Sequence, residues 1–141
     1  MDPVERIRVV LIDDNDVTRG VLRLALPFDI EVVGEAASGR SGLDACLRLK
    51  PDIVFLDILM PDMGGLEILP AIKDALPMTE VLMVTASNDR LTIEQSIMGG
   101  AASFIIKPFS AGTIQDAVNR ALNNLKRKRS AQGAAGSGAA R

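Results

Sequence analysis

Short apolar runs alternate along this chain with segments in which apolar residues recur every three or four positions. The runs are rich in Val and Ile and end at polar, Gly or Pro residues, which is typical of buried strands, whereas the second spacing is typical of helices. Strands are predicted over residues 7–12, 30–36, 52–57, 80–86 and 103–107. Helices are predicted over residues 16–26, 38–50, 65–76, 90–99 and 110–127.

The alternation of strands and helices predicts an α/β fold with a parallel sheet. Parallel strands need crossover connections, and right-handed helical crossovers place helices on both faces of the sheet. A strand covered on both faces is a near-continuous apolar run, as residues 52–57 are here. In open sheets of this kind the functional site lies at the carboxyl ends of the strands, so the polar residues there are the candidates.

Composition and charge indicate one globular domain with a polar tail. The 141 residues are 48% hydrophobic and carry a net charge of −2, which argues against a nucleic-acid-binding surface. We expect the folded domain to span residues 1–127, and residues 128–141, rich in Gly, Ala and Ser, to form a disordered tail or the start of a linker. The basic run KRKR, residues 126–129, is interpreted as cations at a helix C-terminus, with an acidic or nucleic-acid partner as the alternative.

Two residue types restrict the chemistry. The chain contains no His, which excludes His-based catalytic dyads, imidazole metal ligands and a histidine phosphocarrier within this sequence. The single Cys, Cys46, lies on an apolar helical stripe, so we interpret it as a core residue rather than a reactive thiol. No apolar run is long enough to span a bilayer and the first residues do not resemble a signal peptide, so a cytoplasmic location is expected.

Charged and hydroxyl side chains stand at the ends of four predicted strands. Asp13 and Asp14 follow the first strand, Asp57 ends the third, Thr85 lies at the end of the fourth, and Lys107 ends the fifth. Each has an ordinary structural interpretation: an acid at a helix start is commonly a cap, Thr a strand residue and Lys a solvated loop cation. On one rim of one sheet, however, three carboxylates repel one another and raise their proton affinity unless a cation joins them.

The residue types at these strand ends favour phosphoryl-transfer chemistry. A small number of oxygen ligands suits Mg²⁺ better than Zn²⁺ or a fully caged Ca²⁺. An Asp carboxylate can act as a nucleophile and form an acyl phosphate, while Mg²⁺ neutralises the incoming phosphoryl group. Lys107 then supplies a cation to one phosphoryl oxygen, and the Thr85 hydroxyl supplies a hydrogen bond to another.

Four segments occur in a characteristic order on the expected elements: LIDDN (11–15), VFLDILMPDMGG (54–65), MVTAS (83–87) and FIIKPF (104–109). Together they resemble the response-regulator receiver domain of bacterial two-component signalling, of the single-domain chemotaxis-regulator type. The resemblance spans about residues 7–126. It implies a flavodoxin-like, doubly wound sheet of five parallel strands in the order 2-1-3-4-5, with five helices.

The resemblance also implies a role for each strand-end residue. Asp57 is the expected phosphoacceptor, and Asp13 and Asp14 are expected to position Mg²⁺ directly or through water. Asp57 itself and the backbone carbonyl of Leu59 complete the expected metal ligands, and Lys107 is the expected phosphate-binding lysine.

The resemblance further implies a switch rather than an ordinary enzyme. A histidine kinase or histidine phosphotransfer protein would supply the phosphoryl group, which agrees with the absence of His here, and Mg²⁺-dependent self-hydrolysis would remove it. Thr85 would move toward the phosphoryl group and Phe104 would rotate into the space; this switch role of Phe104 is favoured over a plain core role, and the two are compatible. Pro108 is expected to follow a cis peptide bond. The altered face would bind a downstream protein or, as the family allows, a second copy in a phosphorylation-dependent homodimer.

Three other interpretations are weighed against this one. An aspartyl-nucleophile phosphatase needs a second acid two residues past its nucleophile, where this chain has Leu59. A receiver piece of a larger regulator, with an output domain elsewhere, would make the tail a linker. A receiver-like binding module that is never phosphorylated would usually lack one of the acids or the lysine, and all of them are present here.

Two positions lack the polar side chains that orient an attacking water in related domains. They are Leu59, two residues past the acceptor, and Ser87, two residues past Thr85. Leu59 cannot hydrogen-bond and Ser87 is too short to reach, so we predict slow self-dephosphorylation. The substitution Leu59→Asn is expected to speed the decay of phosphorylated protein, followed by intact mass over time. Unchanged decay in the variant would count against this explanation.

Overall fold

The computed structural model describes residues 6–86 and 88–139, and the side chains of residues 6–86 and 88–131. Its strands are β1 (Ile7–Ile12), β2 (Ile30–Ala36), β3 (Ile53–Asp57), β4 (Glu80–Thr85) and β5 (Ser103–Ile106). Its helices are α1 (Asp16–Ala25), α2 (Gly39–Leu49), α3 (Gly65–Ala75), α4 (Arg90–Met98) and α5 (Ala111–Ala139). The predicted bounds agree with these to within one residue, except at the end of α5.

The five strands form one parallel sheet in the order β2-β1-β3-β4-β5, which confirms the predicted topology. β3 lies at the centre, and all five of its residues are buried. Because all strands run in the same direction, their carboxyl ends meet at one edge of the sheet. That edge holds every strand-end residue singled out from the sequence.

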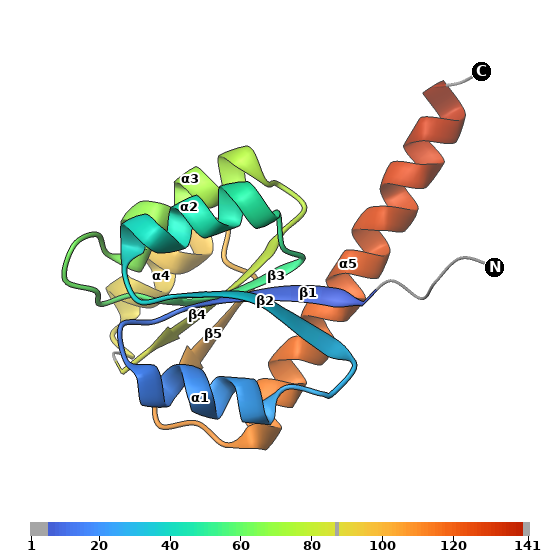
Figure 1. The fold of residues 1–141 in the computed structure, drawn as a ribbon. Helices are drawn as coiled ribbons and strands as arrows, with labels where there is room; N and C mark the ends of the chain where they lie inside the picture. The colour runs from blue at the N-terminus through green and yellow to red at the C-terminus, as the bar shows by residue number, and fades with distance from the viewer. Residues whose placement is uncertain (1–5, 87, 140–141) are drawn as a thin grey trace.

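Successive strand residues point into two separate hydrophobic cores, one on each face of the sheet. In β1, Val9 and Leu11 pack with α1 and α5, whereas Val10 and Ile12 pack with α2 and α3. Figure 1 shows these two pairs of helices on opposite faces, with the sheet between them. Cys46 lies in the second core with no exposed surface, and burial raises the pKa of its thiol to about 12. The prediction of a core cysteine is therefore confirmed.

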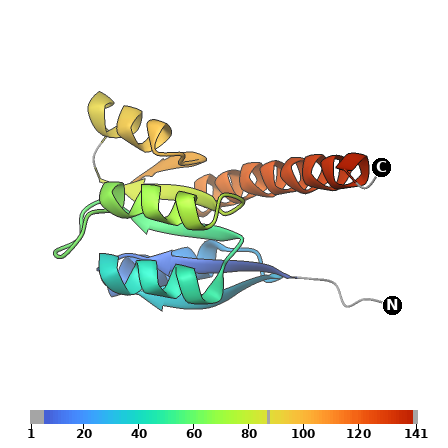
Figure 2. The same ribbon diagram turned by 90° about the horizontal axis from the view of Figure 1, so that it is seen from above.

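The last helix is longer than predicted. α5 was expected to end near residue 127, but it continues to Ala139, and Figures 1 and 2 both show it running past the edge of the sheet at which β1 begins. Ala is the strongest helix former, and adding residues to an existing helix avoids the cost of nucleation. α5 therefore covers residues 128–139 of the segment predicted to be a tail or the start of a linker, and residues 140–141 lie outside the described part of the chain.

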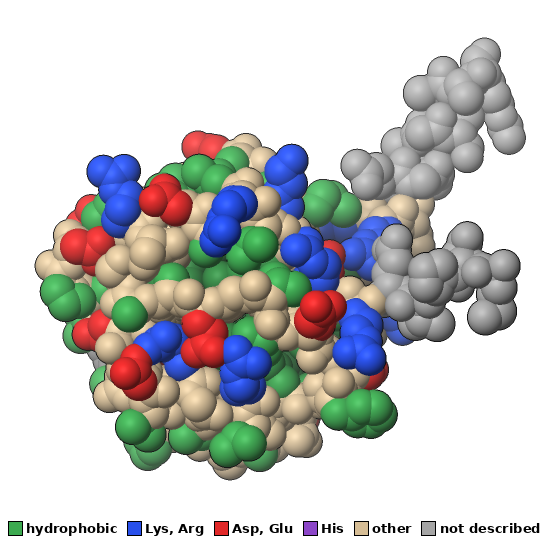
Figure 3. All heavy atoms as spheres, in the orientation of Figure 1, with side chains coloured by type: hydrophobic (Ala, Val, Ile, Leu, Met, Phe, Trp, Pro, Cys, Tyr) green, Lys and Arg blue, Asp and Glu red, His purple; other side chains and the backbone are tan. Residues whose placement is uncertain are grey.

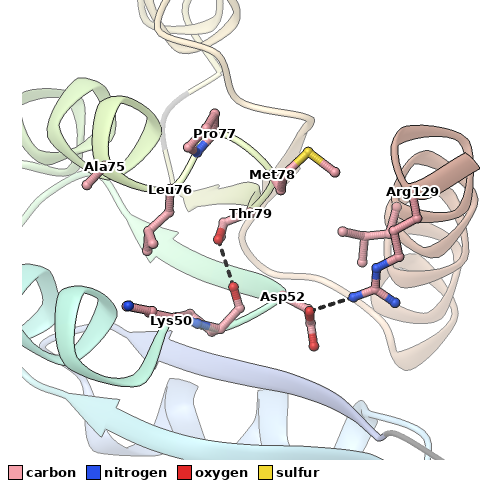
Figure 4. Close-up of a pocket in the computed structure, with 10 residues that line it drawn as sticks. Lys50, Asp52, Ala75, Leu76, Pro77, Met78, Thr79 and Arg129 are labelled. Atoms are coloured by element: carbon pink, nitrogen blue, oxygen red, sulfur yellow. Dashed lines mark hydrogen bonds and ion pairs between the residues drawn. The ribbon is translucent and has the colours of Figure 1, made fainter. Parts of the chain in front are cut away.

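The KRKR run lies inside α5 rather than at its C-terminus, and half of it binds the body of the domain. Lys128 pairs with the carboxylate of Glu80, the first residue of β4, whose side chain is only 3% exposed. Asn124 donates a hydrogen bond of 2.8 Å to the other oxygen of Glu80. Arg129 lies 2.8 Å from a carboxylate oxygen of Asp52, and Figure 4 shows the two meeting beside a hollow at this pole of the sheet.

These contacts extend the docking of α5 beyond its apolar stripe. The buried residues on the inner side of the helix end at Leu125, and the next residues on that side are the two paired cations. We call the contacts of Lys128 and Arg129 with Glu80 and Asp52 the α5 clasp.

The outer surface mixes charges of both signs. On the face drawn in Figure 3, Lys and Arg side chains are interspersed with Asp and Glu. Within the described residues, none of the helices combines the length and the apolar character that crossing a membrane requires.

Removing one cation of the clasp is expected to destabilise the protein. Lys128→Ala removes the cation that pairs directly with the buried carboxylate of Glu80, so the free energy of unfolding should fall by about 2 kcal/mol. Urea unfolding followed by far-UV circular dichroism measures this. The matched control is Lys126→Ala, an exposed cation of the same run, which should change the free energy by less than about 0.5 kcal/mol. Equal effects of the two substitutions would show that the clasp does not stabilise the fold.

Candidate acidic site at the carboxyl edge of the sheet

The register of the central strands places the key residues side by side. Ile12 pairs with Leu56, so the residues that follow them, Asp13 just after β1 and Asp57 at the end of β3, are neighbours at the sheet edge. On the other side of β3, Asp57 pairs with Val84 of β4. Thr85, the next residue of β4, therefore also lies at this edge of the sheet.

Three carboxylates converge at this edge. One oxygen from each of Asp13, Asp14 and Asp57 lies within 4.8 Å of the others. Asp13 is 1% exposed and Asp57 4% exposed, whereas Asp14 is exposed to solvent. The structure therefore brings together the three acids that the sequence analysis grouped.

The local fold at the start of α1 holds Asp13 in place and leaves Asp14 for the site. The N-cap of α1 is Asn15, whose side chain accepts a hydrogen bond of 3.1 Å from the Thr18 amide. The Asn15 amide in turn donates to Asp13 at 2.8 Å. Asp16 pairs with Arg19. Asn15 rather than Asp14 is the helix cap, so the ordinary interpretation of Asp14 as a cap is wrong.

Lys107 brings one positive charge to the three acids. Its ammonium nitrogen lies 3.0 Å from Asp13 Oδ2 and 3.5 Å from Asp57 Oδ2. Its backbone amide donates to the Thr85 carbonyl at 2.8 Å, which ties the end of β5 to the end of β4. The Lys107–Pro108 peptide bond is cis, as the resemblance implied.

The charge of Asp57 is only partly offset. On balance the pKa of its carboxyl is raised from 3.8 to about 6, with burial as the largest cause and the nearby Asp13 carboxylate as the next. The Lys107 ammonium and a hydrogen bond from the Leu59 amide lower this pKa, but the balance still disfavours the ionised form. In this arrangement a second cation near Asp57 would be bound favourably.

The residues present fit a hard divalent cation. Carboxylate oxygens from three residues stand within reach of one another, and the buried Asp13 Oδ2 has the Lys107 ammonium at 3.0 Å as its cation. Such a donor set, with one exposed acid and open solvent on its outer side, suits an ion that keeps several of its waters, as Mg²⁺ does. Mg²⁺ binding is therefore compatible with this edge.

The remaining predicted residues surround this group. Thr85 is fully buried at the end of β4, and Phe104 is half-buried on β5 against the core of α2 and α3. The side chain of Leu59 is 68% exposed, so it offers no polar group next to the acceptor. Ser87, the other position predicted to lack a water-orienting group, lies outside the described residues.

The sequence analysis missed Asp62. This residue of the β3–α3 loop accepts hydrogen bonds from the amides of Arg40 and Gly39, the first residues of α2, and these bonds lower the pKa of its carboxyl to about 2. Asp62 follows its partners by more than twenty positions in sequence, and local patterns do not identify contacts at that separation.

The comparisons with known proteins identify the class. The sequence profile of the response regulator receiver domain matches residues 9–119. The chain belongs to this family.

Particular relatives agree with that assignment. The response regulator protein VraR from Staphylococcus aureus is 40% identical over 116 residues, which cover 81% of this chain and 56% of VraR. The chain thus spans about half the length of the curated relatives it matches. The signal receiver domain of NarL from Mycobacterium tuberculosis has a TM-score of 0.78 at 32% identity, over 86% of this chain and 98% of that one. A CheX–CheY–BeF3–Mg²⁺ complex from Borrelia burgdorferi has a TM-score of 0.76 at 26% identity, over 79% and 86%.

The raised pKa of Asp57 makes stability depend on pH. A carboxyl whose pKa is higher in the folded state, about 6 against 3.8, destabilises the fold as it ionises, so stability falls as pH rises from about 4 to about 6. With EDTA present, Asp57→Asn should therefore be stabler than the wild type above pH 6, by roughly 2 to 3 kcal/mol, and no stabler below pH 4. Urea unfolding across this pH range measures the difference.

The control for this prediction is Asp74→Asn, which replaces an exposed acid of α3. It should follow the wild type at every pH. An Asp57→Asn variant that gains no stability between pH 4 and pH 7.5 would show that the Asp57 carboxylate is not destabilising in the metal-free fold.

Proposed function

We propose that this protein is a phosphorylation-switched response regulator in which Asp57 accepts a phosphoryl group from a phosphohistidine on a histidine kinase or histidine phosphotransfer protein. One observation carries the proposal: a buried carboxylate at the end of the central strand lies beside two further acids and 3.5 Å from the Lys107 ammonium. A core strand holds this nucleophile rigidly, so an approaching phosphorus atom meets it in a fixed direction.

The transfer exchanges one bond to phosphorus for another. A carboxylate oxygen of Asp57 attacks the phosphorus, the P–N bond to the donor imidazole breaks, and the imidazole keeps the electron pair. Lys107, already within ion-pair distance of Asp57 and Asp13, stays close to the charge that develops on the phosphoryl oxygens. The hydroxyl of Thr85, at the next strand end, is the expected hydrogen-bond donor to one of these oxygens.

The acidic group is also the proposed Mg²⁺ site. Asp13, Asp14, Asp57 and the backbone carbonyl of Leu59 would hold the ion. When bound, Mg²⁺ offsets the negative charge shared by the acids and the phosphoryl oxygens. The Leu59 amide already donates to Asp57, so the Leu59 backbone lies at the acceptor. The CheY complex with BeF3 and Mg²⁺ that this chain resembles supports the assignment.

An apolar surface beside the site suits a protein donor. Val17 and Val21 of α1 are exposed, and together with Pro108 and Phe109 they line a hollow that also reaches Lys107. A donor protein seated there would cover apolar area next to the phosphoacceptor, which favours a macromolecular donor over a small one.

The proposed output is a change in packing at α4, β5 and α5. Movement of Thr85 toward the phosphoryl group would vacate space for Phe104, which lines a small cavity under α4. Gly100, just after α4, has a φ of +100°. This backbone conformation is strained for residues other than Gly. Exposed Leu91, Ile97 and Met98 on α4 provide apolar surface for a downstream protein or a second copy.

The protein would act as a switch that catalyses only the transfer of a phosphoryl group to its own Asp57 and the hydrolysis of that group. The apolar Leu59 side chain beside the acceptor favours a long-lived phosphorylated state. We place this switch in the cytoplasm, where a lone buried Cys46 remains reduced.

Phosphorylation by a small donor tests the proposed chemistry. Incubation with acetyl phosphate and Mg²⁺ should add one phosphoryl group, read as intact mass, and EDTA should abolish the gain. Asp57→Asn should gain nothing, because it lacks the nucleophile. The exposed-surface variant Asp74→Asn is the control and should match the wild type. A wild-type protein that gains no mass from acetyl phosphate or from a panel of phosphorylated histidine kinases would refute the proposal.

A further inference from the structure

The loop between β3 and α3, residues 58–64, leaves directly from the phosphoacceptor. It carries Leu59, whose amide donates to Asp57 and whose side chain is largely exposed. The base of the loop is closed by a hydrogen bond of 2.8 Å from the Gly65 amide to the Ile58 carbonyl. The Leu59 side chain does not anchor the loop in the core, so the position of its backbone depends on contacts made elsewhere in the loop.

Asp62 makes such a contact with another element. Its two carboxylate oxygens accept hydrogen bonds from the amides of Gly39 and Arg40, at 2.8 and 2.9 Å. These amides are among the first of α2, which have no partner within the helix. The helix also has its own cap, because Ser38 Oγ accepts from the Ser41 amide at 3.2 Å. Asp62 is therefore a second hydrogen-bond acceptor at the start of α2, and it belongs to the loop that follows the expected phosphoacceptor, Asp57.

The backbones of the loop and the helix start also touch. A Cβ atom added to Gly39 would lie 2.4 Å from the Met63 carbonyl oxygen, closer than any real side chain approaches. Only Gly at position 39 lets the loop come near enough for both Asp62 hydrogen bonds to form.

We propose that Asp62 is a positioning residue: by tethering the β3–α3 loop to the start of α2, it holds the Leu59 backbone where Mg²⁺ and the phosphoryl group at Asp57 require it. The inference rests on the proposed function, because it assigns Asp62 to that site. Asp62 acts through the loop backbone and does not itself touch the reacting atoms.

The test compares two variants that disturb the same helix start. Asp62→Ala removes the tether, whereas Ser38→Ala removes the helix's own cap and leaves the loop contact intact. The chain has no Trp or Tyr, so Mg²⁺ binding is followed by ¹H–¹⁵N NMR of backbone amides near the site. Asp62→Ala should weaken Mg²⁺ binding about 10-fold, the size of effect seen for groups that orient metal ligands. Ser38→Ala should bind Mg²⁺ as the wild type does.

Two further readouts separate positioning from a general loss of structure. Amide hydrogen exchange at Leu59 and Met60 should be faster in Asp62→Ala and unchanged in Ser38→Ala, while thermal unfolding reports any global loss in both. Asp62→Asn keeps one acceptor oxygen, so its Mg²⁺ affinity should lie between those of the wild type and Asp62→Ala.

Each outcome is decisive. Wild-type Mg²⁺ affinity and slow exchange at Leu59 in Asp62→Ala would overturn the inference and leave the proposed function standing. Equal Mg²⁺ losses in Asp62→Ala and Ser38→Ala would show that α2 stability, not the tether, is responsible. Failure of the wild-type protein itself to bind Mg²⁺ would instead overturn the proposed function.

Discussion

The structure is organised around a surplus of negative charge at the carboxyl edge of a parallel sheet. Asp13 and Asp57 stand side by side because β1 and β3 are neighbours in register, and both are almost completely buried. Charges interact strongly where water is excluded, so one ammonium, Lys107, matters greatly and still does not fully offset the acids. A cation added to a site in this state would be bound favourably, which agrees with the Mg²⁺ site proposed above.

The opposite edge of the same strands has the reverse character. Asp52 and Glu80 lie at the amino ends of β3 and β4, and each is paired with a cation of α5. The acids at the amino ends of the central strands are thus paired with cations, whereas the charge of the acids at the carboxyl ends is only partly offset. The charge pairs that hold α5 are therefore separate from the acids at the carboxyl edge. They also give the long last helix an attachment that is independent of the apolar core.

Much of this could be predicted from the chain, and particular residues show why. The near-continuous apolar run before Asp57 is typical of a doubly covered strand, and polar residues at the ends of the other parallel strands are then expected to share one edge. The expected bounds of α5 and the role of KRKR were wrong, because the charge pairs that hold Lys128 and Arg129 join residues 48 and 77 positions apart. The Ala-rich sequence after these two residues does not indicate by itself whether it is helical. It becomes helical here because it extends a helix that is already docked.

The sequence by itself determined the fold class, the strand order implied by its motifs, and the three acids, hydroxyl and lysine that gather at one rim. Periodicity and strand-end position are local properties that predict the elements and the residues at the rim, whereas the strand order was implied by the resemblance to receiver domains. Only the tertiary structure decided that Asn15, not an acid, caps α1, that Asp62 ties the acceptor loop to α2, and that burial outweighs Lys107 at Asp57. Those outcomes depend on which groups meet across the fold and on how much water remains between them. Local sequence patterns predict neither of these.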